Sequence, residues 1–235
     1  MNADGEVNLA SLNLHGGRRA DGSPFDVEAA CTGLKADVIA LQEVWRPGGG
    51  PDPAGAAADA LGARVLHAPL AAGTTLAALG IASERAPGDW GLAVITALPV
   101  DRYEVVSLGR APGDPVPRGA QLVTATLPGG GRLRIANTHL THRYTSPVQL
   151  LRLIRLLRQD PAPTVIVGDL NMPGPVSGLA PGYSRAVRGR TFPAHWPLVQ
   201  LDHMLATRDV RAGDGEVAAP AGSDHLPIRA RLRLG

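Results

Sequence analysis

The chain has 235 residues, of which 44% are hydrophobic and 19% are charged, and its formal net charge at pH 7 is +2. These values exclude a polar, disordered chain and provide enough apolar side chains for a single domain, which we expect to span residues 1–235. They also argue against a high-affinity nucleic-acid-binding face, since only 3% of the residues are aromatic and basic residues cluster little beyond Arg18-Arg19 and one helical stripe.

Cys31 is the only cysteine, so the sequence predicts no internal disulfide and no thiolate metal site. Its place on the apolar side of a helical pattern favours a small buried side chain. Residues 1–6 lack the basic and then apolar layout of a signal peptide, and no apolar run reaches membrane-spanning length. We therefore expect a soluble, cytoplasmic protein with no transmembrane segment.

Short apolar runs separated by glycine and proline follow one another along the first part of the chain. In chain order they predict a strand over 7–14, a helix over 24–34, a nearly continuous apolar strand over 38–42, a short helix over 56–61, and strands over 64–67, 76–82, 92–96, 103–108, 121–127 and 132–138. The segment Pro128-Gly129-Gly130-Gly131 predicts a hairpin connection between the last two strands.

One helix, over residues 146–157, is well signalled. Ser146 and Gln149 predict a capping box, with Pro147 at the first helical position. An arginine stripe on another face of the helix is explained more simply by solvent exposure than by phosphate binding. Strands are predicted over 165–167, 201–206 and 228–232, with a long irregular region over 172–197. Strands thus outnumber the interspersed helices, which predicts sheet packed on sheet with helices outside.

Polar side chains that can carry chemistry lie at or beside the ends of the predicted strands. They are Asn13, Glu43, His139, Asp169, Asn171, Asp202, Asp224 and His225. A carboxylate that follows an apolar strand needs a cation or hydrogen-bond donors, because an unpaired buried charge is costly. Taken singly, each has an ordinary explanation, such as a surface acid, a turn or a structural Asp–His pair. The ordered set is what indicates function.

The chain resembles the endonuclease/exonuclease/phosphatase superfamily in an ordered series of motifs: Asn13, Gln42-Glu43, Thr138-His139-Leu140, Gly168-Asp169-Leu170-Asn171, Asp202 and Ser223-Asp224-His225-Leu226-Pro227. The Gly-Asp-Leu-Asn and Ser-Asp-His-Leu-Pro elements are its most specific marks. The superfamily includes pancreatic-type deoxyribonucleases, abasic-site endonucleases, neutral sphingomyelinases, deadenylases and inositol-polyphosphate 5-phosphatases. The resemblance implies an α/β (α+β) fold, a four-layer sandwich of two mixed β-sheets flanked by helices.

The resemblance also implies a metal site. Glu43 would be the principal ligand, with Asn13 and Asp224 beside it. Oxygen ligands without cysteine suit Mg²⁺ first and Mn²⁺ second. The metal would bind a phosphate oxygen and neutralise the charge that develops there.

The remaining residues would have catalytic roles. His225 would act at the scissile phosphate, and Asp202 would fix the tautomer of its imidazole ring. Asp169 would orient or deprotonate the attacking water, while Asn171 and His139 would donate hydrogen bonds to phosphate oxygens. Asp169 and His225 are both candidates for the general base.

Four further residues are candidates for substrate contact: His15, Arg118, Phe192 and Trp196. Arg118 occupies a place where relatives often carry Arg-Gly. It either contacts the phosphate of the substrate or is an ordinary loop arginine. Phe192 and Trp196 either form an apolar or stacking wall at the site or pack their own long loop. His15 either touches the substrate or makes hydrogen bonds within its loop.

The sequence therefore predicts a hydrolase, a divalent-metal-dependent phosphodiesterase or phosphatase that uses water to attack phosphorus. A lipid headgroup or another small phosphorylated molecule is the first substrate class, and a nuclease acting on DNA or RNA is the alternative. A catalytically inactive binding module is a third hypothesis, against which the complete set of motifs argues. No partner protein is implied.

Overall fold

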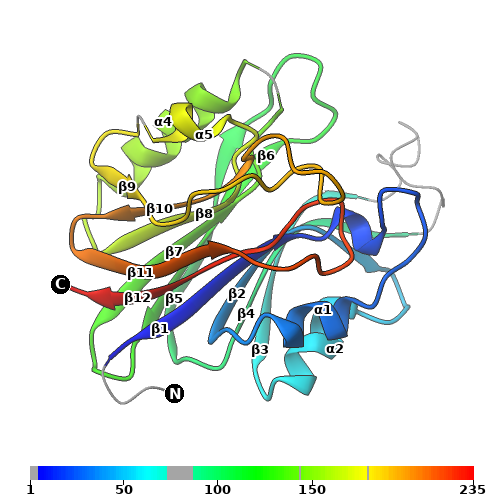
Figure 1. Ribbon diagram of the computed structural model, residues 1–235, viewed down its shortest axis with the longest axis horizontal. Helices are drawn as coiled ribbons and strands as arrows, with labels where there is room; N and C mark the ends of the chain where they lie inside the picture. The colour runs from blue at the N-terminus through cyan, green and yellow to red at the C-terminus, as the bar shows by residue number, and fades with distance from the viewer. Residues whose placement is uncertain (1–4, 73–86, 143, 179) are drawn as a thin grey trace.

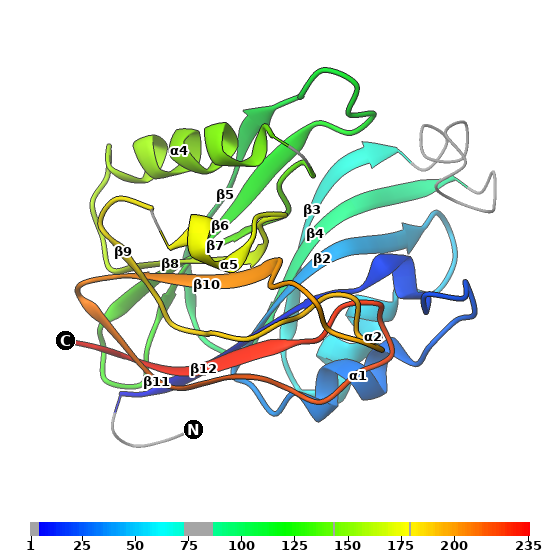
Figure 2. The same cartoon turned by 45° about the horizontal axis from the view of Figure 1, so that its top comes forward.

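The computed structural model describes residues 5–72, 87–142, 144–178 and 180–235. Two mixed six-stranded β-sheets pack face to face, and helices lie on the outer side of each sheet (Figure 1). Figure 2 shows α4 (Ser146–Leu157) outside one sheet and α1 (Val27–Gly33) and α2 (Pro53–Ala60) outside the other. The predicted four-layer sandwich is therefore confirmed. None of the described helices is long and apolar enough to cross a membrane.

The first sheet has the strand order β11-β12-β1-β2-β4-β3. Its strands are β1 (Val7–Asn13), β2 (Val38–Pro47), β3 (Arg64–Ala72), β4 (Gly88–Thr96), β11 (Val210–Val217) and β12 (Ile228–Leu234). β1 pairs in parallel with β2 and antiparallel with β12, so the first and last strands lie side by side. Helices α1 and α2 bury their apolar side chains, including Cys31, against the outer face of this sheet.

The second sheet has the strand order β5-β6-β7-β8-β10-β9. Its strands are β5 (Val100–Gly109), β6 (Arg118–Thr126), β7 (Arg132–Thr138), β8 (Thr164–Asp169), β9 (Tyr183–Arg185) and β10 (Asp202–Thr207). Helix α4 packs its leucines on the outer face, near the short helix α5 (Gly174–Ser177). A short 3-10 helix, η1 (His15–Gly17), follows β1.

The apolar core between the sheets is built from alternate residues of the strands and turns polar towards one end. Leu9, Ala40, Ile135 and Val167 belong to this core. Because successive strand residues face opposite sides, the residue two positions further along each strand faces the same way. Those residues are Ser11, Gln42, Asn137 and Asp169, all of them buried. Strand periodicity therefore carries polar side chains from four strands to one end of the sandwich.

Several predicted boundaries are wrong. The helix predicted over 24–34 begins only at Val27, because the Asp26 side chain accepts a hydrogen bond from the Ala29 amide and caps it. The helix predicted over 56–61 is Pro53–Ala60. The strand predicted over 76–82 lies outside the described residues.

The capping box predicted at the start of α4 is also wrong. Thr145 is the N-cap, and the Gln149 side chain is used elsewhere: its Oε1 accepts from the Thr141 amide at 2.9 Å and its Nε2 donates to the Thr141 hydroxyl at 3.2 Å. The arginine stripe of this helix, comprising Arg152, Arg155 and Arg158, is exposed as expected.

Candidate active site

The polar side chains predicted at the strand ends come together where the two sheets meet. Asn13 ends β1 of the first sheet, and Asp169 ends β8 of the second. The Asn13 amide donates to Asp169 Oδ2 at 3.1 Å and to Glu43 Oε1 at 3.2 Å. The Asn13 amide therefore joins the Glu43 carboxylate of the first sheet to the Asp169 carboxylate of the second.

Glu43 reaches this cluster because β2 is irregular. The pairing of β2 with β4 shifts register between Leu41 and Val44, and the φ angle of Glu43 is 49°. Gln42 faces the core, so in a regular strand the Glu43 side chain would point to the opposite face of the sheet. The bulge changes this direction and turns the Glu43 side chain towards the cluster. Glu43 Oε1 lies 3.8 Å from His139 Nδ1 as a result.

Two more residues of the cluster have left-handed backbone conformations. The φ angle is 46° at His15 and 50° at Asn171. Non-glycine residues rarely adopt this conformation, which costs about 1–3 kcal/mol and occurs preferentially at functional sites. Glu43, His15 and Asn171 are three of the five described non-glycine residues with a positive φ angle, and the other two, Lys35 and Asp214, lie outside the cluster.

His225 and Asp202 form a buried pair. His225 Nδ1 lies 2.8 Å from Asp202 Oδ2, so the ring donates its Nδ1 proton to the carboxylate, while Nε2 faces Asp169 Oδ2 at 3.8 Å. Burial lowers the pKa of His225, but the charges of Asp202 and Asp169 outweigh it and raise the pKa to about 10. Burial raises the pKa of Asp169 to about 7, an effect that His225 opposes.

His139 and Asn171 lie on the other side of Asp169. The Asn171 amide donates to the Leu140 carbonyl at 2.9 Å and lies 3.1 Å from His139 Nε2, so Nε2 accepts and the ring proton is on Nδ1. Burial holds the pKa of His139 well below its usual value, and the positive charge of Arg118 lowers the pKa further. His139 is therefore a neutral ring whose buried Nδ1 has no hydrogen-bond partner among the described residues.

Asp224 lies at the more exposed side of the cluster. Its Oδ1 accepts from the Ser223 hydroxyl at 3.2 Å and lies 3.6 Å from His15 Nδ1. The His15 amide donates to Asn13 Oδ1 at 3.0 Å. His15 thus links Asp224 to Asn13, and all eight predicted polar residues belong to one cluster.

The loop between β9 and β10 holds the Asp202–His225 pair in place. The buried Thr191 hydroxyl accepts from the amides of Leu201 at 3.0 Å and Asp202 at 3.2 Å. The Phe192 ring lies 4.8 Å from the His225 ring. Trp196, by contrast, is 70% exposed. Thr191 was not predicted as a site residue. The sequence signal that could have indicated it is the segment Thr191-Phe192-Pro193, which precedes Asp202.

Arg118 is buried beside His139, so its interpretation as an ordinary loop arginine is wrong. It begins β6, and its guanidinium carbon lies 5.7 Å from the centre of the Trp90 ring. The Trp90 ring in turn lies 5.8 Å from the His139 ring. Its partner, Asp114, was not predicted from the sequence.

Within the described part of the chain, histidine rings are the only basic groups within ion-pair distance of four carboxylates of the cluster. These carboxylates are Glu43, Asp169, Asp202 and Asp224. Four carboxylates that have His225 as a strongly basic neighbour, but no arginine or lysine, favour a cation, because their mutual repulsion and burial are otherwise costly. Their oxygens, with that of a neighbouring amide, are ligands that Mg²⁺ and Mn²⁺ accept. The residues present therefore fit a divalent cation.

One group of described residues brings its ligand atoms together, and the sequence predicts another. In one, Asp169, Asp202 and His225 each offer a ligand atom within 4.8 Å of the others. In the other, Glu43, Asn13 and Asp224 offer only oxygen atoms. In the first group, His225 Nδ1 and one Asp202 oxygen already form a hydrogen bond, and in the second Asn13 Oδ1 accepts from the His15 amide.

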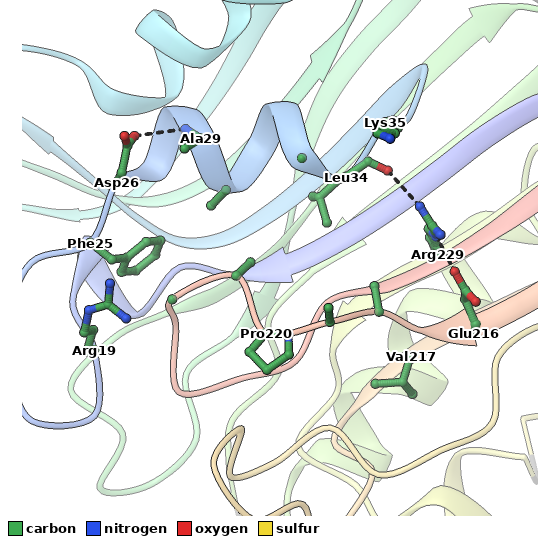
Figure 3. Close-up of a pocket in the computed structure, with 16 residues that line it drawn as sticks. Arg19, Phe25, Asp26, Ala29, Leu34, Lys35, Glu216, Val217, Pro220 and Arg229 are labelled. Carbon is green, nitrogen blue, oxygen red and sulfur yellow. Dashed lines mark hydrogen bonds and ion pairs between the residues drawn. The ribbon is translucent and has the colours of Figure 1, made fainter.

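A large hollow of the described surface lies elsewhere. A cavity of about 840 Å³ opens between α1 and residues 216–222 (Figure 3). Asp26 caps α1, and Arg229 bonds to Glu216 and to the Leu34 carbonyl, while Arg19 and Lys35 also line the cavity. None of the eight polar residues of the strand-end cluster lines this cavity.

Comparison with known proteins agrees with this arrangement. Residues 10–225 match the model of the Endonuclease/Exonuclease/phosphatase family, whose members are hydrolases of phosphoester bonds and generally depend on divalent metals. No curated protein matches the sequence.

Three solved structures illustrate the similarity of fold. An endonuclease/exonuclease/phosphatase from Beutenbergia cavernae is 21% identical, with a TM-score of 0.72 over 98% of this chain and 72% of that one. One from Bacteroides vulgatus is 17% identical, with a TM-score of 0.75 over 98% and 99%. The human Nocturnin catalytic domain with bound sulfate anion is 15% identical, with a TM-score of 0.72 over 98% and 95%.

Proposed function

The chain belongs to the endonuclease/exonuclease/phosphatase family, and we propose that it is a divalent-metal-dependent phosphohydrolase that cleaves a phosphoester by attack of water at phosphorus. The observation that carries the proposal is the bridge from Asn13 to both Glu43 and Asp169. This bridge supports the proposal because it joins Glu43 to the buried Asp169 carboxylate, which faces the His225–Asp202 pair.

Glu43, Asn13 and Asp224 would hold Mg²⁺ or Mn²⁺. We prefer this group because it consists of oxygen atoms alone, whereas the alternative group contains a histidine that already bonds to Asp202. When bound, the ion would neutralise negative charge on a phosphate oxygen during hydrolysis.

The chain's own residues would perform the proton transfer and hold the phosphate. Asp169 Oδ2 lies 3.1 Å from the Asn13 amide and 3.8 Å from His225 Nε2, so it is placed to orient a water and accept its proton. His225, fixed by Asp202, would donate from Nε2 to a phosphate oxygen. The unpartnered Nδ1 proton of His139 would donate to another, which is hydrogen bonding of the kind that stabilises developing charge.

A small phosphorylated molecule or lipid headgroup is the substrate class we favour. The low aromatic content and the net charge of +2 provide little of the basic, stacking surface that nucleic acids require. The human Nocturnin catalytic domain, which shares the fold, binds a sulfate anion. A nuclease is the second candidate, because the family also contains endonucleases and exonucleases.

The test compares bis(p-nitrophenyl) phosphate, phospholipids, plasmid DNA and RNA as substrates with Mg²⁺, Mn²⁺ or EDTA. We expect metal-dependent hydrolysis of the small diester or a phospholipid, abolished in Glu43→Gln and retained in Glu28→Gln, an exposed acid in α1. Cleavage of nucleic acid at rates far above the small diester would select the nuclease instead. Absence of metal-dependent cleavage of every substrate would overturn the proposal.

A further inference from the structure

A buried ion pair lies beside the candidate active site. Arg118 Nε donates to Asp114 Oδ2 at 2.9 Å, and Nη2 donates to Asp114 Oδ1 at 3.5 Å. The side chains are only 6% and 1% exposed. A buried pair does not by itself indicate stabilisation, because removing two charges from water offsets much of their attraction. Its position next to His139 suggests another role.

Asp114 is held by groups other than Arg118. Its carboxylate accepts from the Thr141 hydroxyl at 2.5 Å and from the Val116 amide at 3.1 Å. Gln149 of α4 holds Thr141 in turn, through both the amide and the hydroxyl. Burial would raise the pKa of Asp114, but the hydrogen bonds from Thr141, Arg118 and Val116 keep it below the usual value. The Asp114 carboxylate is therefore negatively charged and held in a fixed position.

Arg118, in contrast, has one guanidinium nitrogen left without a partner. Its Nη1 is buried and has no hydrogen-bond partner within the described residues. The guanidinium lies against the face of Trp90, whose ring contacts His139. A buried unsatisfied donor costs about 1–3 kcal/mol, so a protein rarely keeps one without a use.

We propose that Asp114 is a positioning residue, which holds Arg118 so that Nη1 donates to a phosphate oxygen of the substrate bound beside His139. The guanidinium is a rigid planar fork, so fixing Nε and Nη2 on Asp114 also fixes the direction of Nη1. Because the side chain is ordered before the substrate binds, little rotamer entropy is lost on binding. The inference rests on the proposed function, since it requires a phosphate group at this site.

The test measures the binding of inorganic phosphate by calorimetry and the steady-state kinetics of bis(p-nitrophenyl) phosphate, both in the presence of Mn²⁺. In Asp114→Asn we expect the Kd of phosphate and the KM to rise about ten-fold, with kcat changed less, because loss of uniform binding raises KM. Asp160→Asn, which removes the carboxylate of an exposed pair with Arg102, is the matched control and should leave both constants unchanged.

A double-mutant cycle separates positioning from a merely structural role. If Asp114 acts through Arg118, adding Asp114→Asn to Arg118→Ala should not raise the Kd of phosphate beyond that of Arg118→Ala alone. Thr141→Val, which removes one hydrogen bond to Asp114, provides a milder variant if Asp114→Asn fails to fold. We expect it to raise the Kd in the same direction by a smaller factor.

An unchanged Kd in folded Asp114→Asn or Thr141→Val would overturn the inference, as would additive effects in the cycle. Wild-type turnover separates this outcome from failure of the proposed function. Metal-dependent turnover with unaltered phosphate binding in the variants would remove only the role of Asp114. Absence of both turnover and phosphate binding in the wild type would remove both proposals.

Discussion

Asn137 is the centre of the polar layer that separates the apolar core from the candidate active site, and replacing it by alanine should destabilise the protein strongly. The side chain is fully buried in β7. Its amide donates to the carbonyls of Leu41 and Ala93, each at 3.0 Å, on the opposite sheet. Its oxygen accepts from Gln42 Nε2 at 2.8 Å.

The magnitude follows from the groups that lose a partner. Three buried acceptors would lose a donor, namely the two carbonyls and Gln121 Oε1, which accepts from the Asn137 amide at 3.2 Å. At about 1–3 kcal/mol each, this gives about 3–9 kcal/mol for Asn137→Ala. Gln42 contributes less, because its amide also reaches the Ser11 hydroxyl at 3.1 Å. The expected loss is a large part of the total stability, which for a domain is about 5–15 kcal/mol.

Urea denaturation, followed by circular dichroism, measures this loss of stability. We expect a lower urea concentration at the unfolding midpoint and an unchanged m-value. Asn137→Leu fills the volume without restoring the donors, so it should remain destabilised by a similar amount. The exposed Gln159→Ala is the control. A loss below about 1 kcal/mol in Asn137→Ala, or near-wild-type stability in Asn137→Leu, would refute the reasoning, because the unpaired carbonyls would then cost nothing.

Three further predictions concern single residues. Burial raises the pKa of Cys31 from 9.0 to about 12, so the native thiol should resist thiol reagents. Between those pH values the unfolded chain loses the thiol proton and the folded chain keeps it, so the free energy of unfolding should fall as the pH rises. The fall should be steeper than in Cys31→Ala by up to about 1.4 kcal/mol per pH unit. Asp202→Asn should lower kcat by about 10²–10⁴-fold with little change in Tm, because His225 loses the carboxylate that orients it; equal kcat would contradict this. Thr191→Val should lower kcat and stability together, since the amides of Leu201 and Asp202 lose their acceptor; an unchanged Tm would contradict it.

The sequence predicted the strands best, and with them most of the cluster. Apolar runs located strands such as β1 and β8, and the polar residues at their ends fall on the core-facing side because side chains alternate. On this ground the sequence alone predicts that Asn13, His139 and Asp169 face the core side of their sheets. The order of the motifs then supplied the expected roles.

Features that depend on pairing between distant segments were not predictable in the same way. The bulge that turns Glu43 towards the cluster is a property of the register between β2 and β4. Strand β11 is mostly exposed and rich in polar residues and glycine, so it gave no apolar signal. Asp114 stands in a proline- and glycine-rich loop, where only the folded chain shows that it meets Arg118 and Thr141.

The capping of α4 shows a related limit. Ser146 and Gln149 have the spacing of a capping box, but a tertiary contact with Thr141 takes the Gln149 side chain. Local propensity predicted a helix here correctly, and tertiary hydrogen bonding decided how its first turn is satisfied.

The most direct test of the central claim is a crystal structure of the protein with Mn²⁺ and inorganic phosphate, read from the anomalous signal of manganese. We expect an anomalous peak bound by Glu43, with Asn13 and Asp224 beside it. The phosphate should accept from Arg118 Nη1 and His225 Nε2. A peak bound instead by Asp169, Asp202 and His225 would contradict the assignment of the metal site, and a phosphate remote from the strand-end cluster would contradict the proposed chemistry.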